Sequence, residues 1–305
     1  MKKHLRIGSR GSKLAVIQAE SIRDQLALRN PEIDFEMVTV STTGDQNTTV
    51  SLEQLGGEGI FVKELEDALL REEIDIAVHS LKDMLTTIPE GLRLAAVPQR
   101  VDPRDVIISK AGKLAELPTG SRIGTGSQRR AVQIHSMRPD LEVCGLRGNI
   151  DTRIKKAFSN ELEGIIMAAA ALVRLGMEDK ITEHLSTEDF IPAVGQGALG
   201  IEIRADDANS YEIVVPLNHD STWQSITAER AFLRALGGGC RAPIAALGSV
   251  ENGILRLNGI VSDPKGNTIL HANVEGNASN AEEVGEELAS EMIRLGANPL
   301  IEKGQ

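Results

Sequence analysis

The chain has 305 residues and a formal net charge of −11, from 33 Lys and Arg against 44 Asp and Glu. Its length predicts two or three domains at roughly 100–200 residues each, and an acidic chain with 2% aromatic residues excludes nucleic acid as an expected partner. No apolar run is long enough for a membrane span or a signal peptide, so we expect a cytoplasmic protein without membrane contact.

Strand and helix patterns alternate along the first third of the chain. Residues 4–8 predict a strand, the apolar positions that follow up to Ile22 predict a helix, and residues 34–41 predict a second strand. Residues 61–69 carry apolar side chains at helical spacing and precede a β-branched run at residues 74–79. This alternation predicts α/β layering with a largely parallel sheet.

The middle third repeats a strand-then-helix unit. The predicted pairs are 121–126 with 128–137 and 141–146 with 151–158, followed by a third buried strand at 164–170. Glycines at residues 192–197 predict a hinge before a strand at 199–204.

The last third predicts a small antiparallel sheet covered by helices. A helix over 225–236 stops at three glycines, and the final helix runs through Val284, Leu288 and Met292. Between them lie three strand candidates separated by hairpin turns, at residues 244–250, 254–261 and 268–274.

Positive charge gathers in the middle of the chain. Residues 1–98 carry a net charge of −5, residues 99–192 carry +1 and residues 193–305 carry −7, and nine of the 14 basic groups in the middle segment are arginines. The planar guanidinium suits bidentate binding of carboxylate or phosphate. Scattered, solvated arginines remain the alternative for any single position.

Two segments carry side chains suited to chemistry. Ser80-Leu81-Lys82-Asp83 follows a predicted strand, where α/β sheets place ligand crevices, although a surface Asp–Lys pair explains it equally well. Gly124 to Arg130 forms a glycine turn from strand to helix with two arginines in the first helical turn, which favours an anion. It matches neither a Walker A loop nor a dinucleotide fingerprint. The second strand-then-helix pair has Arg147 and Arg153 at the corresponding turn, after its strand and at the start of its helix.

The two cysteines differ in context. Cys240 lies in a loop rich in Gly and Pro beside Arg241, where a thiol can act as a nucleophile or an attachment point, whereas Cys144 is expected to pack in a strand. The six histidines show no metal-ligand spacing, so no metal is expected, and His79 is expected to be structural.

Together these motifs resemble the porphobilinogen deaminase (hydroxymethylbilane synthase) family. The matching segments span most of the chain in the family's order: residues 6–15, 61–66, 75–83, 124–130, 146–149, 195–197 and 237–240. The resemblance implies a transferase of haem biosynthesis that joins four porphobilinogen molecules head to tail, releases four ammonia and yields hydroxymethylbilane. It also implies a dipyrromethane cofactor held by a thioether to Cys240, and a monomer.

The resemblance also assigns roles to individual residues. Asp83 matches the catalytic aspartate, with Lys82 beside it. Matches to cofactor-binding positions are Cys240, Ser80, Lys82, Asp83, Thr125, Ser127, Arg129, Arg130, Arg147 and Gly148, and matches to substrate-binding positions are Arg10, Ser12, Arg147, Arg153, Arg174 and Gln196. Three positions depart from the common pattern, namely Gln54, Glu58 and Leu85. The first two remove positive charge from an active-site loop.

The implied fold is α/β, with two domains like type II periplasmic binding proteins and a small α/β domain with a three-stranded antiparallel sheet. The expected boundaries are 1–98 with 198–216 for domain 1, 99–197 for domain 2 and 217–305 for domain 3. The alternative function is that of a non-catalytic, two-lobed carboxylate-binding protein, for which an exposed cysteine has no use.

Overall fold

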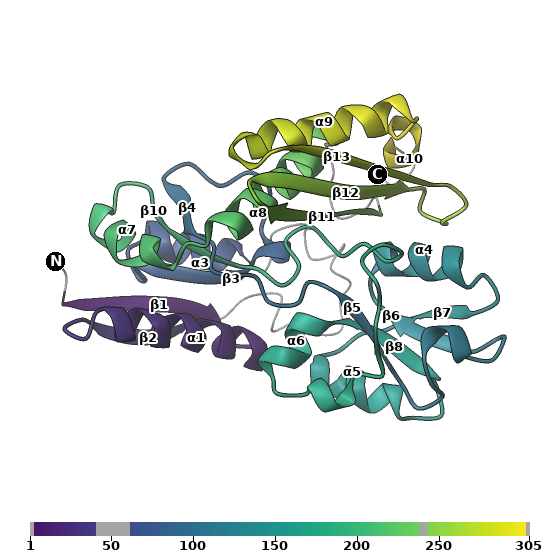
Figure 1. The fold of residues 1–305 in the computed structure, drawn as a ribbon. Coiled ribbons are helices and arrows are strands. Elements are labelled where there is room, and N and C mark those ends of the chain that lie inside the picture. Colours follow the sequence, from purple (N-terminus) through teal and green to yellow (C-terminus); the bar gives the residue numbers. More distant parts are fainter. Residues whose placement is uncertain (1–2, 41–61, 238–242, 303–305) are drawn as a thin grey trace. The chain divides into compact units, whose positions relative to one another are not determined.

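A computed structural model describes residues 3–40, 62–237 and 243–302 of the protein. Over these residues the strands form two five-stranded sheets and one three-stranded sheet, separated by helices (Figure 1). The chain divides into two compact units, unit 1 (Met1–Val101 and Gly197–Trp223) and unit 2 (Asp102–Gln196 and Gln224–Gln305). The predicted fold class, α/β with two larger sheets and a small antiparallel sheet, is confirmed.

The sheet of unit 1 has the strand order β2-β1-β3-β10-β4. Its strands are β1 (His4–Arg10), β2 (Asp34–Val40), β3 (Ile76–Ser80), β4 (Leu92–Ala96) and β10 (Leu199–Arg204). β1 runs parallel to β2 and β3, whereas β10 is antiparallel to both β3 and β4. The prediction of a largely parallel sheet is therefore wrong here, because a returning segment inserts β10 in the opposite direction.

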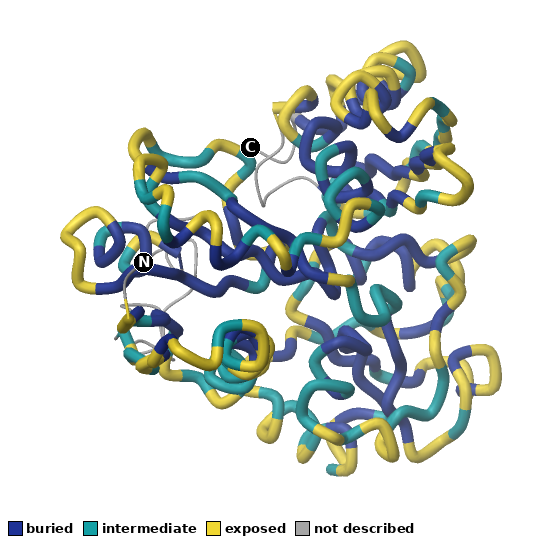
Figure 2. Tube along the Cα trace, turned by 60° about the vertical axis from the view of Figure 1, so that its left-hand side comes forward, coloured by how far each residue is buried: buried dark blue, intermediate teal, exposed yellow. Residues whose placement is uncertain are grey.

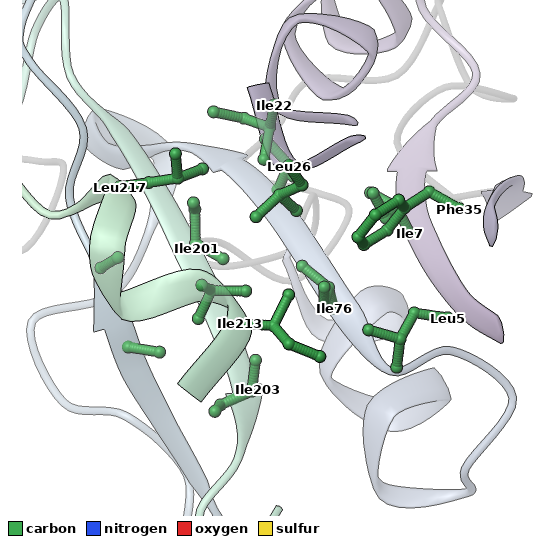
Figure 3. Close-up of a cluster of buried hydrophobic side chains, with 14 of the residues drawn as sticks. Leu5, Ile7, Ile22, Leu26, Phe35, Ile76, Ile201, Ile203, Ile213 and Leu217 are labelled. Carbon is green, nitrogen blue, oxygen red and sulfur yellow. The ribbon is translucent and has the colours of Figure 1, made fainter. Parts of the chain in front are cut away.

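Helices cover both faces of this sheet. One face packs against α1 (Lys13–Arg29) and α7 (Ala208–Val214), and the other against α3 (Lys63–Leu70). Figure 3 shows the cluster on the α1 face, in which branched side chains from several strands meet those of the helices. The helical spacing of Ala19, Ile22 and Leu26 places all three in this core.

The larger sheet of unit 2 has the order β7-β6-β8-β5-β9. Its strands are β5 (Asp105–Ser109), β6 (Arg122–Thr125), β7 (Glu142–Gly145), β8 (Gly164–Ala168) and β9 (Glu183–His184). β6 is parallel to β7 and β8, while β5 is antiparallel to its two neighbours, so this sheet is also mixed. The strand predicted to reach residue 170 ends at Ala168, because α6 (Ala169–Arg174) begins there.

Two further helices pack on this sheet. Ile134 of α4 (Gln128–Met137) joins a cluster with Ile123 and Ile166, and Ala157 of α5 (Ile150–Ala157) joins one that includes Ile165. Because Ile165 and Ile166 are neighbours in β8, their side chains point to opposite faces. The strand is therefore buried on both sides, as its continuous apolar sequence requires.

The three-stranded sheet of unit 2 is antiparallel throughout and packs against helices. It contains β11 (Ile244–Glu251), β12 (Ile254–Ser262) and β13 (Ile269–Asn277), with α8 (Asp220–Ala235), α9 (Ala281–Arg294) and α10 (Asn298–Glu302) beside it. Helix α8 starts earlier than the predicted residue 225. The β11–β12 turn places Asn252 and Gly253 at φ +51° and +77°, as a tight hairpin requires. Figure 2 shows buried stretches of the chain, in dark blue, inside each part and exposed stretches, in yellow, at the outside.

Candidate active site

The turn after β3 holds Asp83 at the carboxyl end of a buried strand. It is a short 3-10 helix, Leu81–Asp83, in which Leu81 is buried and donates its backbone N–H to Ala198 O at 3.1 Å. Lys82 and Asp83 are exposed. Among the residues that the structure describes, the Asp83 carboxylate has no hydrogen bond or ion pair. It is therefore a fixed anionic group that can accept a hydrogen bond from a ligand.

A small cavity of about 20 Å³ adjoins this turn in unit 1. Arg10 ends β1 and Ser80 ends β3, and because these strands are parallel neighbours, both residues reach the same edge of the sheet. The cavity is lined by Arg10, Ala15, Gln18, Val62, Val78, His79, Ser80 and Asp83. Thus three residues assigned by resemblance, Arg10, Ser80 and Asp83, lie together.

Helix α1 contributes differently from what the sequence indicated. Ser12 is its N-cap and accepts the Ala15 N–H at 3.3 Å, so its side chain already has a structural partner. Gln18, which sequence reasoning missed, lines the cavity and accepts a hydrogen bond from Ser80 Oγ at 3.0 Å. Gln18 could have been predicted from the sequence, because it is a polar residue on the apolar face of the helix, between Ala15 and Ile22.

The glycine turn of unit 2 forms as predicted from the sequence. Ser127 caps α4, accepting the Arg130 N–H at 3.5 Å, and its own N–H donates to Thr125 Oγ1 at 3.2 Å. A Cβ on Gly126 would lie 2.6 Å from the carbonyl oxygen of Leu146, so only glycine fits there. The turn thus packs closely against the start of the loop that carries Arg147.

Arg129 and Arg130 are buried rather than open to solvent. Both guanidinium groups lie 2.8 Å from Asp105, a carboxylate with no exposed surface at the start of β5. Gln196 donates to Asp105 Oδ1 at 3.0 Å and accepts from Arg130 at 3.4 Å. Desolvation lowers the pKa of Arg129, and the charge of Asp105 opposes that shift. The single carboxylate of Asp105 therefore forms ion pairs with two buried guanidinium groups.

Asp105 was missed in the sequence, although an acidic residue opening the apolar run Asp-Val-Ile-Ile-Ser was visible. Its own pKa is lowered because the two arginines outweigh the desolvation that would raise it. Arg129 also donates to Ile191 O at 2.7 Å, which fixes its guanidinium to the chain just before the glycine-rich segment. Arg129 and Arg130, which were predicted to bind a ligand, therefore belong to a buried network that holds the fold together.

The other arginines of unit 2 that were predicted to bind a ligand are less buried than Arg129 and Arg130. Arg147 is exposed, with no hydrogen bond or ion pair to other described residues, and Gly148 beside it has φ +113°. Arg153 is half-buried and donates to Gly148 O at 2.7 Å, and desolvation, then the charge of Arg130, lowers its pKa. Desolvation also lowers the pKa of Arg174, to about 10. Because Arg153 and Arg174 have lost part of their hydration, an anionic ligand would stabilise their charged forms.

Family models match nearly the whole chain. Residues 5–212 match "Porphobilinogen deaminase, dipyromethane cofactor binding domain", and residues 223–294 match "Porphobilinogen deaminase, C-terminal domain". The chain belongs to the porphobilinogen deaminase family. The resemblance inferred from the motifs is confirmed.

Curated relatives agree over their full lengths. The porphobilinogen deaminase of Carboxydothermus hydrogenoformans is 47% identical over 99% of this chain and 98% of its own, and that of Syntrophobacter fumaroxidans is 43% identical over 98% and 97%. Among solved structures, the aliphatic sulphonate binding protein SsuA from Escherichia coli is 14% identical over 77% of this chain and 70% of its own, with a TM-score of 0.40. That score is too low to add to the fold described above.

Several family positions fall outside the described residues, namely Cys240, Gln54 and Glu58. Cys144 lies in β7 and is half-buried, packed against the apolar cluster under α5, as expected for a strand residue. Burial, followed by the charge of Glu142, raises the pKa of its thiol. Over the described ranges, no helix could cross a membrane and no cluster of side chains could hold a metal ion.

Proposed function

We propose that this protein joins four porphobilinogen molecules head to tail into hydroxymethylbilane, with release of four ammonia. The observation that carries the proposal is the unpaired carboxylate of Asp83 beside Arg10 and Ser80, in a chain that belongs to the porphobilinogen deaminase family from end to end. The transferase class, haem biosynthesis and porphobilinogen as substrate are parts of the same proposal.

Asp83 acts on the pyrrole nitrogen and on the cation formed when ammonia leaves. A fixed carboxylate that has no partner among the described residues accepts a hydrogen bond from the pyrrole N–H and stabilises the positive charge that develops in the ring. Its position on a short turn anchored by Leu81 keeps it in place without reorganisation. Lys82, exposed beside it, adds a cation for a substrate carboxylate.

The cations of unit 2 suit a ligand with several carboxylates. Each pyrrole of the dipyrromethane cofactor and of the growing chain carries an acetate and a propionate. Unit 2 supplies the capped glycine turn at Ser127, the exposed Arg147 and the half-buried, desolvated Arg153 and Arg174. These donors fit carboxylates, and Asp105 holds Arg129 and Arg130 in place by ion pairs.

The dipyrromethane group, when bound through Cys240, supplies the pyrrole carbon on which the product is built. The residues of this chain then hold its carboxylates and position its pyrrole N–H groups. In the proposal Thr125, Ser127, Arg147 and Gly148 bind its carboxylates, and Asp83 accepts hydrogen bonds from its pyrrole N–H groups.

An intact-mass measurement tests the attachment. The purified protein is expected to be heavier than its sequence by one dipyrromethane, and Cys240→Ser to lose both the excess mass and the activity. Cys144→Ser is the matched control, because that thiol is half-buried in β7, and it should keep both. A native mass equal to the sequence mass in a fully active protein would contradict the cofactor assignment.

We propose the domain boundaries given from the sequence, a cytoplasmic location and a monomer. The alternative, a non-catalytic carboxylate-binding protein, is disfavoured because the full-length relatives cited above are all named for a deaminase. Consumption of porphobilinogen by the purified protein distinguishes the two. A protein that binds porphobilinogen but never consumes it would support the alternative.

A further inference from the structure

Next to the cavity, three buried ionisable side chains of unit 1 lie close together. His79 Nε2 lies 3.0 Å from Glu202 Oε2, and both side chains have at most 2% exposure. Glu66 on α3 is the third, and it is 8% exposed. The strand register explains their meeting: His79 and Ala77 of β3 face α3, and Glu202 of β10 is paired directly with Ala77.

A carboxylate buried among apolar side chains costs free energy unless hydrogen bonds satisfy its oxygens. Here the second oxygen of Glu202, Oε1, is also buried and has no hydrogen-bond partner among the described residues. Removal of water raises the pKa of Glu66 to about 7, and the charge of Glu202 contributes to that rise. Glu66 therefore exchanges a proton near neutral pH.

The orientation of the imidazole leaves its second nitrogen available. An ionised carboxylate can only accept, so Nε2 carries the hydrogen that is donated to Glu202, and Nδ1 of the neutral ring is basic. Nδ1 makes no hydrogen bond within the described part of the chain. His79 also lines the cavity together with Asp83.

The cavity has the size and polarity to hold one water molecule. Its volume of about 20 Å³ exceeds the roughly 10–15 Å³ that one water needs. Arg10, Gln18, Ser80 and Asp83 provide polar partners, of which a buried water uses two to four. Asp83 and His79 are both among the residues that line the space for this water.

The proposed reaction releases one proton at each condensation. When the new carbon–carbon bond forms, the C–H bond at the attacking α-carbon breaks and its electron pair restores the pyrrole ring. The freed proton needs an acceptor at neutral pH. An ordinary carboxyl, with a pKa near 4, cannot keep it.

On the basis of the proposed function, we infer that His79, held by Glu202 and backed by Glu66, receives the proton lost from the α-carbon through a water in the cavity beside Asp83. The imidazole becomes imidazolium and then gives the proton to solvent, where the ammonia released earlier in the same turnover binds it as ammonium. The charged groups facing His79 are Glu202 on β10, Glu66 on α3, and Arg10 and Asp83 at the cavity. His79 is thus more than the packing residue expected from the sequence.

The test compares His79→Gln and Glu202→Gln with Ile203→Val, a neighbouring core change in β10 outside this cluster. Wild-type consumption of porphobilinogen is measured first, since its absence refutes the proposed function and not this inference alone. Then kcat is measured against pH, with ordinary porphobilinogen and with porphobilinogen deuterated at the free α-carbon.

We expect His79→Gln to lower kcat about 100-fold at neutral pH, as for loss of a positioned acid–base group. The deuterium isotope effect should become large in both cluster variants, because proton loss then limits the rate, and should stay at the wild-type value in Ile203→Val. Folded variants with an unchanged isotope effect and an unchanged pH profile would overturn the inference.

One measurement needs no variant, in case a substitution in the cluster prevents folding. The ring-nitrogen NMR signals of His79 in the wild-type enzyme should report both the neutral imidazole and the imidazolium, and their proportion should change when porphobilinogen binds. An imidazole that keeps one protonation state with and without porphobilinogen would equally overturn the inference.

Discussion

The two regions that carry the proposed chemistry hold their charges in opposite ways. In unit 1 the Asp83 carboxylate projects from a turn and lacks a described partner, while in unit 2 Arg129 and Arg130 are buried on a shared carboxylate, Asp105. An exposed, unpaired group contributes little to folding and is free to act on a ligand. A buried, paired group is part of the fold, and its removal affects the fold before it affects any reaction.

The largest effect on turnover is therefore expected at Asp83. Asp83→Asn keeps the shape but removes the charge that stabilises the substrate cation, so turnover should fall at least about 100-fold, with the melting temperature and the cofactor mass unchanged. Glu90→Gln, another exposed carboxylate in the same unit, is the control and should retain activity. Near-normal turnover of Asp83→Asn would remove this residue from the reaction.

At Asp105 we expect a loss of stability, in contrast to the loss of turnover without a loss of stability at Asp83. Asp105→Asn leaves two buried guanidinium groups without their anion, which should destabilise the protein by about 3–5 kcal/mol, seen as a lower midpoint in urea unfolding. Asp102→Asn, three residues earlier and only partly buried, should cost far less.

A second substitution separates charge from shape in this network. Adding Arg129→Met to Asp105→Asn removes one of the two stranded cations and should restore part of the lost stability, because fewer unpaired charges remain buried. If the double variant were less stable than Asp105→Asn alone, charge balance would not be what holds the network together.

A smaller effect on catalysis is expected at the exposed Arg147. Arg147→Leu should lower kcat/KM for porphobilinogen about 10- to 100-fold, the value of one or two charge-assisted hydrogen bonds, without changing the melting temperature. Arg256→Leu, an exposed arginine of the small sheet, serves as the control. Unchanged kinetics in Arg147→Leu would show that this loop does not bind the substrate.

Most elements could be predicted from local patterns, and the site only in part. The α1 and α4 helices and the hairpins of the small sheet follow from periodicity, caps and turn residues. The mixed sheets could not be predicted that way, because the direction of β10 depends on a pairing with β3 more than 100 residues away in sequence. For the same reason the partners of His79 and Arg129 were invisible, since Glu202 and Asp105 reach them only through tertiary structure.

The smallest effect, and the most specific to the buried cluster of unit 1, concerns Glu66. Its pKa is raised from 4.5 to about 7 in the folded protein, chiefly by burial, so the native state binds the proton more tightly than the unfolded chain does. The stability that this proton provides is full below pH 4.5 and is lost as the pH rises through about 7. In Glu66→Gln that loss is absent.

Unfolding free energies measured at pH 5 and pH 8 should therefore show the Gln variant gaining about 1–3 kcal/mol relative to wild type between the two. Glu90→Gln, whose carboxylate is exposed, should show no such gain. A parallel pH dependence in wild type and Glu66→Gln would mean that Glu66 is already ionised beside Glu202. The buried layer would then hold two carboxylate charges beside the imidazole of His79.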